Sequence, residues 1–293
     1  MRTMAHIAAL QAMTVFGVVL TVPLAAHAQE LKATAQVTQL TAEVDTTSTD
    51  RVGDAGQPAG PMPTPEHTGL KAFALDLLDD VKHLPATENY WWAAVGGAGA
   101  LAVHPADKRV TQYFVDASWA HDVFAFGAVL GNTPELLAIS GGVYGVGRWK
   151  DNKAVSHVGM DLLQALIVSN ALVQGLKYAT RRERPDGSAA TSFPSGHASD
   201  TFAVATALER HLGWRGAVPA YAFASYVAMS RLHDNRHYLS DVVFGSTVGI
   251  ISGRTVTRHG REFPVAVTAI PGGAAIVYSR RMDEGPRGDP PSR

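Results

Sequence analysis

The sequence has no cysteine, which excludes disulfides, thiol catalysis and thiolate metal sites. Charged residues are scarce, at 17%, and the net charge is only −1. A nucleic-acid partner or a polybasic attachment to a membrane is therefore not expected. After the N-terminal segment, polar residues interrupt each apolar run before it reaches the roughly 20 residues of a membrane span. The mean hydropathy is close to zero. These absences favour a water-soluble or peripheral protein.

What the sequence does contain is ample apolar material, 46% of the 293 residues, which is enough for one sizeable core. At the N-terminus, the positive start Met1-Arg2 precedes a mostly apolar stretch, Ile7–Leu24, and then Ala26-His27-Ala28. This order is typical of a secretory signal peptide over residues 1–28, cleaved before Gln29. We therefore expect a periplasmic protein. The alternative is membrane association through an uncleaved anchor, because the apolar stretch is just long enough to span a bilayer.

Composition divides the rest of the chain into four parts. Residues 29–68 are rich in Thr, Ala, Asp, Gly and Pro without periodicity, so we expect a disordered linker. Apolar stretches with helical spacing predict a helical domain over 69–258. Two β-prone runs around Pro271-Gly272-Gly273 predict a small C-terminal β-hairpin over 259–282. The Pro- and Gly-rich residues 283–293 are expected to form a disordered tail.

The helical domain is expected to be all-α. Leu70, Phe73 and Leu77 share one helical face and mark its first helix. Apolar spacing and punctuation by Gly and Pro predict further helices over Trp91–His104, Lys108–Gly131, Pro134–Val146, Val155–Tyr178, Ala198–Leu212, Val218–Ser230 and Leu239–Val256.

Three short segments together supply the groups that catalysis on a phosphoryl group needs. A phosphoryl group in transfer spreads negative charge over its oxygens, so the protein must mainly position it and stabilise that charge. The segments hold three cations, a glycine turn, two histidines and one carboxylate. They read Lys177 followed after six residues by Arg184-Pro185, then Pro194-Ser195-Gly196-His197, and finally Ser230-Arg231 followed by His237 and Asp241.

The cations and the glycine turn suit the phosphate oxygens. Arg184 and Arg231 can make forked, bidentate contacts with these oxygens, and Lys177 acts as a compact charge. Ser195 and Gly196 add hydroxyl and backbone N–H donors, because glycine lets the chain approach a ligand closely. We therefore expect these five residues to bind phosphate.

The two histidines suit covalent catalysis. His237 and Asp241 are four residues apart, so at the start of a helix both point to one face and the carboxylate can fix one imidazole nitrogen. The other nitrogen is then free to attack phosphorus. His197 stands on a separate segment, where it can protonate the leaving oxygen and later deprotonate water.

The three segments resemble the complete motif set of the type-2 phosphatidic acid phosphatase and vanadium haloperoxidase superfamily, over roughly residues 90–256. This resemblance implies an all-α helical bundle of the acid phosphatase/vanadium haloperoxidase type. It implies a phosphohistidine on His237, oriented by Asp241, with acid–base work by His197. No metal and no cofactor is implied. The phosphate-binding residues that the resemblance implies are Lys177, Arg184, Ser195, Gly196 and Arg231.

The activity expected from this resemblance is that of a phosphoric monoester hydrolase. Its substrate is a soluble phosphate ester or a lipid phosphate reached at the membrane surface, and the sequence specifies no oligomeric state. Vanadate is an expected inhibitor. The alternative is a vanadate-dependent haloperoxidase, in which His237 would hold vanadate as a prosthetic group. The mature chain is shorter than typical haloperoxidases, which favours the phosphatase. The short connection Asp186–Phe193 between the first two motifs predicts an open pocket mouth.

Other polar and aromatic residues receive a structural interpretation from the sequence. Arg181 and Arg182 can add positive potential beside the first motif, but a solvated turn is the preferred interpretation. His157 and Asp161 repeat the four-residue spacing without accompanying cations, so we expect a structural pair. The aromatic cluster at residues 90–92 can contact a membrane surface, although core packing is preferred.

Overall fold

The structure is a computed structural model that describes residues 64–258, 265–270 and 273–278. The chain divides into two units, one ending at Thr257 and one beginning at Arg258, and each is described by itself. Residues 64–258 contain helices and no strand, which confirms the all-α prediction for this part of the chain. Its elements are α2 (Leu70–His83), α3 (Thr87–Val103), η1 (His104–Ala106), α4 (Asp107–Asp116), α5 (Ser118–Phe124), α6 (Gly127–Leu130), α7 (Thr133–Trp149), α8 (Lys153–Thr180), α9 (Gly196–Leu212), α10 (Trp214–His233) and α11 (Leu239–Val256).

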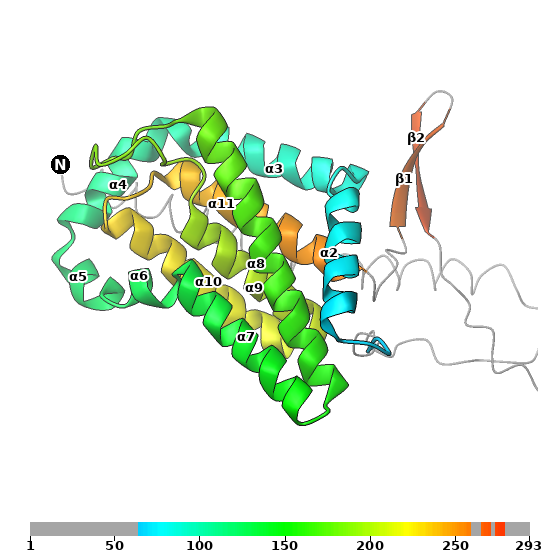
Figure 1. Cartoon of the computed structure of the whole chain (residues 1–293). Helices are drawn as coiled ribbons and strands as arrows, with labels where there is room; N and C mark the ends of the chain where they lie inside the picture. The colour runs from blue at the N-terminus through cyan, green and yellow to red at the C-terminus, as the bar shows by residue number, and fades with distance from the viewer. Residues whose placement is uncertain (1–63, 259–264, 271–272, 279–293) are drawn as a thin grey trace, which may run out of the picture. The chain divides into compact units, whose positions relative to one another are not determined.

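Two long helices, α7 and α8, lie side by side as an antiparallel pair (Figure 1). α8 begins after Asn152, whose side-chain oxygen accepts a hydrogen bond of 3.1 Å from the N–H of Val155 and caps the helix. Gly159 lets α7 approach closely, because a Cβ there would lie 2.3 Å from the backbone nitrogen of Tyr144. The cap and the close contact fix the start and the direction of α8. This helix carries Lys177 in its last turn.

The helix α11 is buried along almost its whole length, and glycines line its contact with α9. Gly245, Gly249 and Gly253 follow one another at four-residue spacing, so they share one face. A Cβ on Gly245 would lie 2.5 Å from the carbonyl oxygen of Ser195, and one on Gly249 would lie 2.2 Å from that of Ser199. The two backbones therefore touch. This contact brings the N-terminal ends of α9 and α11 together.

The hydrophobic core is centred on α10 and on the helices that surround it. Phe202 of α9 packs against Tyr221 of α10, with ring centroids 5.8 Å apart, and both side chains are fully buried. The Tyr221 hydroxyl donates a hydrogen bond to Glu209 at 2.8 Å, which satisfies this buried phenol. Phe114 and Phe124 extend the same core toward α4 and α5.

The segment predicted as one helix over Lys108–Gly131 is instead three helices, α4, α5 and α6. Ala117 has an extended backbone, with φ −78° and ψ 105°, and separates the first two. The breaks let the chain wrap around α10, where a Cβ on Gly127 would lie only 2.3 Å from Ser230 Cβ. Tertiary packing therefore overrides the local helical pattern. α10 also begins at Trp214, earlier than predicted.

The aromatic residues near the start of α3 do not form the buried cluster that was preferred from the sequence. Trp92 packs against the core. Tyr90 and Trp91 are 63% and 69% exposed. Core packing is thus wrong for two of the three residues, because adjacent positions on a helix point in different directions.

One helix of the described residues, α8, is long and apolar enough to cross a membrane. Its apolar window has a mean hydropathy of 1.2, and 56% of that window is buried inside the bundle. A buried core helix passes the same test of length and composition.

The second unit contains two strands, β1 (Val265–Ile270) and β2 (Gly273–Tyr278), which pair antiparallel. Its role as a hairpin extension of the helical domain stays a prediction. The predicted signal peptide, 1–28, and tail, 283–293, lie outside the described residues, and so does the linker up to residue 63.

The glycine contact between α9 and α11 can be tested with a matched pair of substitutions. Gly249→Ala forces a methyl group against the Ser199 carbonyl, so we expect a loss of about 1–3 kcal/mol, as for other overpacked sites. The midpoint of thermal unfolding should fall by roughly 5 °C. Gly142→Ala is the control, because Gly142 is exposed on α7 with nothing within 4 Å of the added Cβ. It should leave the midpoint unchanged or raise it, and equal effects of the two substitutions would contradict the account.

Candidate active site

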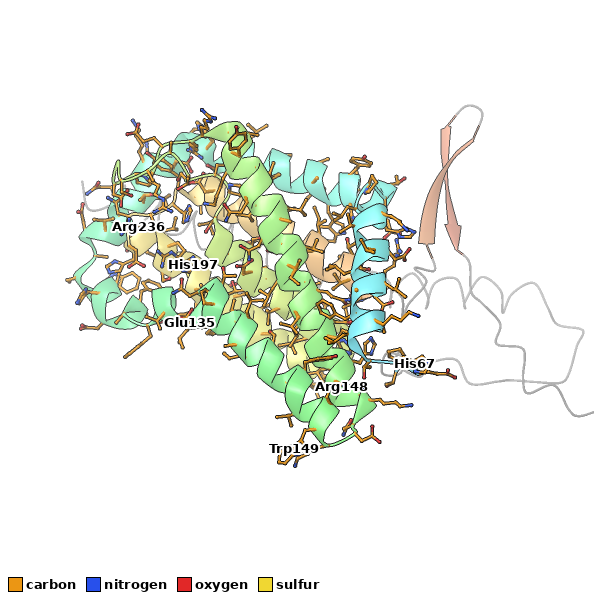
Figure 2. All side chains as sticks on the ribbon, viewed as in Figure 1. His67, Glu135, Arg148, Trp149, His197 and Arg236 are labelled. Carbon is orange, nitrogen blue, oxygen red and sulfur yellow. The ribbon has the colours of Figure 1, made fainter. Side chains whose placement is uncertain are left out.

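The three sequence motifs lie at helix ends that meet at one end of the bundle. Lys177 is in the last turn of α8, and Arg231 is in the last turn of α10. His237 precedes α11, and His197 stands in the first turn of α9. The backbone N–H of Ser195 donates a hydrogen bond of 3.0 Å to the carbonyl oxygen of Asp241, which ties the starts of α9 and α11 together. Figure 2 shows His197 and Arg236 toward this end.

A fully buried carboxylate, that of Asp241, connects these segments. Its Oδ2 accepts hydrogen bonds from the Ser192 hydroxyl at 2.5 Å and from the backbone N–H of Tyr238 at 2.8 Å. Its Oδ1 accepts one from Arg182 Nη1 at 2.6 Å. Burial alone would raise the pKa of Asp241, but the hydrogen bonds and the positive charge of Arg182 hold it below its ordinary value. Asp241 is therefore ionised at neutral pH.

His237 is also buried, and its Nδ1 lies 2.7 Å from the carbonyl oxygen of Ser192. A carbonyl only accepts hydrogen bonds, so Nδ1 carries the proton and Nε2 has a free lone pair. Asp241 Oδ2 is 3.8 Å from Nδ1, too far for a hydrogen bond. In this geometry the carboxylate acts on the imidazole through its charge at 3.8 Å, and the direct hydrogen bond of the ring goes to the carbonyl of Ser192. Asp241 holds the hydroxyl of Ser192, and the carbonyl of Ser192 holds the ring.

The pKa of His237 is lowered from its ordinary value. The main cause is burial, to which the positive charges of Lys177 and Arg231 add, while the charge of Asp241 opposes them. His237 is therefore neutral at neutral pH. A neutral imidazole with a free Nε2 is the form that a nucleophile requires.

Arg182, which was interpreted as part of a solvated turn, is instead a central residue of the site. Its Nη2 donates to Asp107 Oδ2 at 2.7 Å while Nη1 donates to Asp241, and its guanidinium lies 4.4 Å from the ring centroid of Tyr238. Asp107 in turn accepts the backbone N–H of Ser240 at 2.8 Å. Arg182 thus links α4 to the start of α11. The only sign of this role in the sequence was the position of Arg182, two residues before Arg184.

The cations predicted to bind phosphate influence one another electrostatically. Burial lowers the pKa of Lys177 to about 8, the charge of Arg184 adds to this effect, and that of Asp241 opposes it. The pKa of Arg231 is lowered as well, first by burial and then by Arg236 and Arg184, although Asp234 raises it. This mutual lowering shows that the structure brings the positive charges of separate motifs into one region.

Several buried donors in this region have no hydrogen-bond partner among the described residues. They are Nε of Arg184, Nε of Arg231 and the hydroxyl of Ser195. Buried polar groups are nearly always satisfied, and leaving one unpaired costs about 1–3 kcal/mol. Two guanidinium donors and a hydroxyl suit an oxyanion. Together they form a candidate binding site for a phosphate group.

The sequence of this region is similar to that of a known protein family. Residues 158–263 match the family model described as the PAP2 superfamily. We call these residues, which are similar to that family, the PAP2 segment. The resemblance inferred from the sequence is thereby confirmed, and the matched residues include the three motifs.

A curated relative of the PAP2 segment is the lipid A 1-phosphatase of Porphyromonas gingivalis. The two are 42% identical over an alignment 99 residues long, and the match covers 30% of this chain and 22% of the relative. The chain thus spans about a fifth of that relative's length.

Two solved structures are similar to the chain as well. LpxE of Aquifex aeolicus is 21% identical, with a TM-score of 0.44, and the match covers 52% of this chain and 94% of that one. A transmembrane PAP2 type phosphatidylglycerolphosphate phosphatase from Bacillus subtilis is 23% identical, with a TM-score of 0.47, and the match covers 64% and 94%.

The role of Arg182 can be tested against its neighbour. Arg182→Gln removes a charged hydrogen bond to the buried Asp241, worth about 1.5–3 kcal/mol, so kcat should fall roughly 10- to 100-fold. KM should change little, because Arg182 is bonded to carboxylates rather than turned to a ligand. Arg181→Gln is the control, since Arg181 is exposed and lies over the Tyr178 ring. Equal losses of kcat in both variants would show that Arg182 does not position the site.

Proposed function

We propose that this protein is a phosphatase that hydrolyses phosphate monoesters through a phosphohistidine on His237. The observation that carries the proposal is the state of that imidazole. It is buried and neutral, its Nδ1–H is held by the Ser192 carbonyl, and the positive charges of Lys177 and Arg231 act on it. This combination supports a nucleophile facing a phosphate site.

In the first proposed step, the Nε2 lone pair of His237 forms a bond to phosphorus as the bond to the ester oxygen breaks. His197 gives its proton to the leaving oxygen, so an alcohol departs. Lys177, Arg184 and Arg231 stabilise the negative charge on the equatorial oxygens, and the donors of Ser195 and Gly196 complete the site.

In the second step, His197 takes a proton from a water molecule that attacks phosphorus. The N–P bond breaks, its electron pair returns to Nε2 of His237, and inorganic phosphate leaves. His197 is then protonated for the next cycle. The reaction involves no metal or cofactor, and PAP2 phosphatases need none.

A lipid phosphate is the substrate class that we propose. The curated relative of the PAP2 segment is a lipid phosphatase by name, which also favours the phosphatase over the haloperoxidase alternative. The exposed Tyr90 and Trp91 on α3 are side chains typical of a membrane interface. We therefore propose that the protein acts in association with a membrane, rather than as the free periplasmic enzyme expected from the sequence.

Phosphate release from two substrates tests this function. A detergent-dispersed lipid phosphate and a soluble aryl phosphate are each incubated with the full chain, with and without vanadate. We expect release that favours the lipid, that vanadate inhibits, and that His237→Ala abolishes. His104→Ala is the control, because His104 is exposed and remote from the motifs in sequence. Halide oxidation with added vanadate, without phosphate release, would overturn the proposal in favour of the haloperoxidase.

The pH dependence should reflect Lys177. Because its pKa is lowered to about 8, Lys177 loses its positive charge as the pH rises through that value. We therefore expect kcat/KM, which reports the free enzyme, to fall above a pH of about 8. Lys177→Arg keeps its charge in this range, so the alkaline fall should move to higher pH even if the overall rate drops. An unchanged alkaline fall in this variant would assign it to another group.

A further inference from the structure

A second cluster of polar side chains lies away from the phosphate site. His157 and Asp161 are four residues apart on α8, and His211 comes from the end of α9. Nε2 of His211 lies 2.8 Å from Asp161 Oδ2, and Nε2 of His157 lies 3.5 Å from the same oxygen. One donor atom from each residue lies within 4.8 Å of the others. Two imidazoles therefore aim the same type of nitrogen at one carboxylate oxygen.

This cluster is separate from the motifs that bind phosphate. His197 is the second residue of α9 and His211 the last but one, so they stand about 20 Å apart at 1.5 Å per residue. The start of α8 follows the end of α7, where Arg148 and Trp149 lie. Figure 2 shows these two residues at the opposite end of the bundle from His197. The phosphatase reaction proposed above does not use these three side chains.

We propose that His157, Asp161 and His211 form a binding site for a divalent transition metal, and that zinc is the ion it takes. Zinc prefers imidazole nitrogen and carboxylate oxygen at about 2.0–2.2 Å, in a tetrahedral arrangement. Two donors of such a tetrahedron stand about 3.4 Å apart. The spacings around Asp161 Oδ2, 2.8 and 3.5 Å, are close to this value, so small side-chain movements suffice.

The surroundings of the three residues also suit a bound metal. Their side chains are only 3–10% exposed, which limits competition from water. The imidazole rings are nearly perpendicular, at 86°, with centroids 4.9 Å apart. This splayed arrangement lets both Nε2 atoms point at one ion without the rings clashing. The chain has no cysteine to compete for the metal.

A metal here would join the start of α8 to the end of α9. A metal site is rarely preformed in an unfolded chain, so the binding free energy adds to the stability of the fold. The proposal concerns stability and metal content, and it does not depend on the phosphatase function. If the phosphatase proposal failed, the metal site could still be present, and the reverse also holds.

Metal content is the first test. The full chain, purified with a tag that contains no histidine, is incubated with zinc, dialysed and analysed for metal by mass spectrometry. We expect about one zinc per chain. His211→Gln should lose it, while the amide of glutamine can still donate a hydrogen bond to Asp161 and so preserve the fold. His83→Gln is the matched control, because His83 also lies four residues from an aspartate, Asp79, but no second histidine of the described residues joins this pair.

Thermal unfolding provides a second measurement that does not depend on activity. Zinc at about a hundred times its dissociation constant should raise the unfolding midpoint of the wild-type chain and of His83→Gln by roughly 5 °C. The midpoint of His211→Gln should not respond to zinc. The proposal is overturned if the wild-type chain retains no zinc, or if His211→Gln retains as much. It is also overturned if His237→Gln, and not His211→Gln, loses the metal, since zinc would then occupy the phosphate site.

Discussion

The candidate active site depends on the hydrogen bonds of one buried carboxylate, that of Asp241. Removing a charge from water costs several kcal/mol, so the carboxylate is stable only while its partners remain in place. Those partners are the hydroxyl of Ser192 and the guanidinium of Arg182, both in the connection between α8 and α9, and the N–H of Tyr238 at the start of α11. Arg182 extends the connection to Asp107 on α4. One buried charge therefore ties together the connection between α8 and α9, the start of α11 and the start of α4, and with them the ring of His237.

The glycines of α11 make this arrangement possible. Because Gly245 and Gly249 have no side chain, the backbone of α11 reaches that of α9, and the starts of both helices meet. The proposed phosphate donors at the start of α9 then lie beside His237, the proposed nucleophile, at the start of α11. The close contact between the glycines of α11 and the backbone of α9 thus determines both the packing of these helices and the arrangement of the candidate site at their starts. A bulkier residue at either glycine would separate the two halves of the site.

The sequence predicted candidate site residues because catalysis on a phosphoryl group restricts the types and spacing of the residues that perform it. It also predicted α11 to the residue, since Leu239–Val256 has a clear apolar pattern between polar ends. The break of Lys108–Gly131 was missed, because it follows from packing on α10. Asp107 and Ser192 were missed too, because their roles arise only when distant segments meet. For the same reason the pair of His157 and Asp161 gave no sign of His211.

The most direct test of the account is to find which atom carries phosphate during turnover. The wild-type chain is mixed with a phosphate monoester, quenched in base within one turnover, digested and mapped by mass spectrometry. The account predicts phosphate on His237, attached to Nε2, because the Ser192 carbonyl holds the Nδ1–H. Phosphate on another side chain would contradict the account, and so would turnover in which no phosphorylated residue forms.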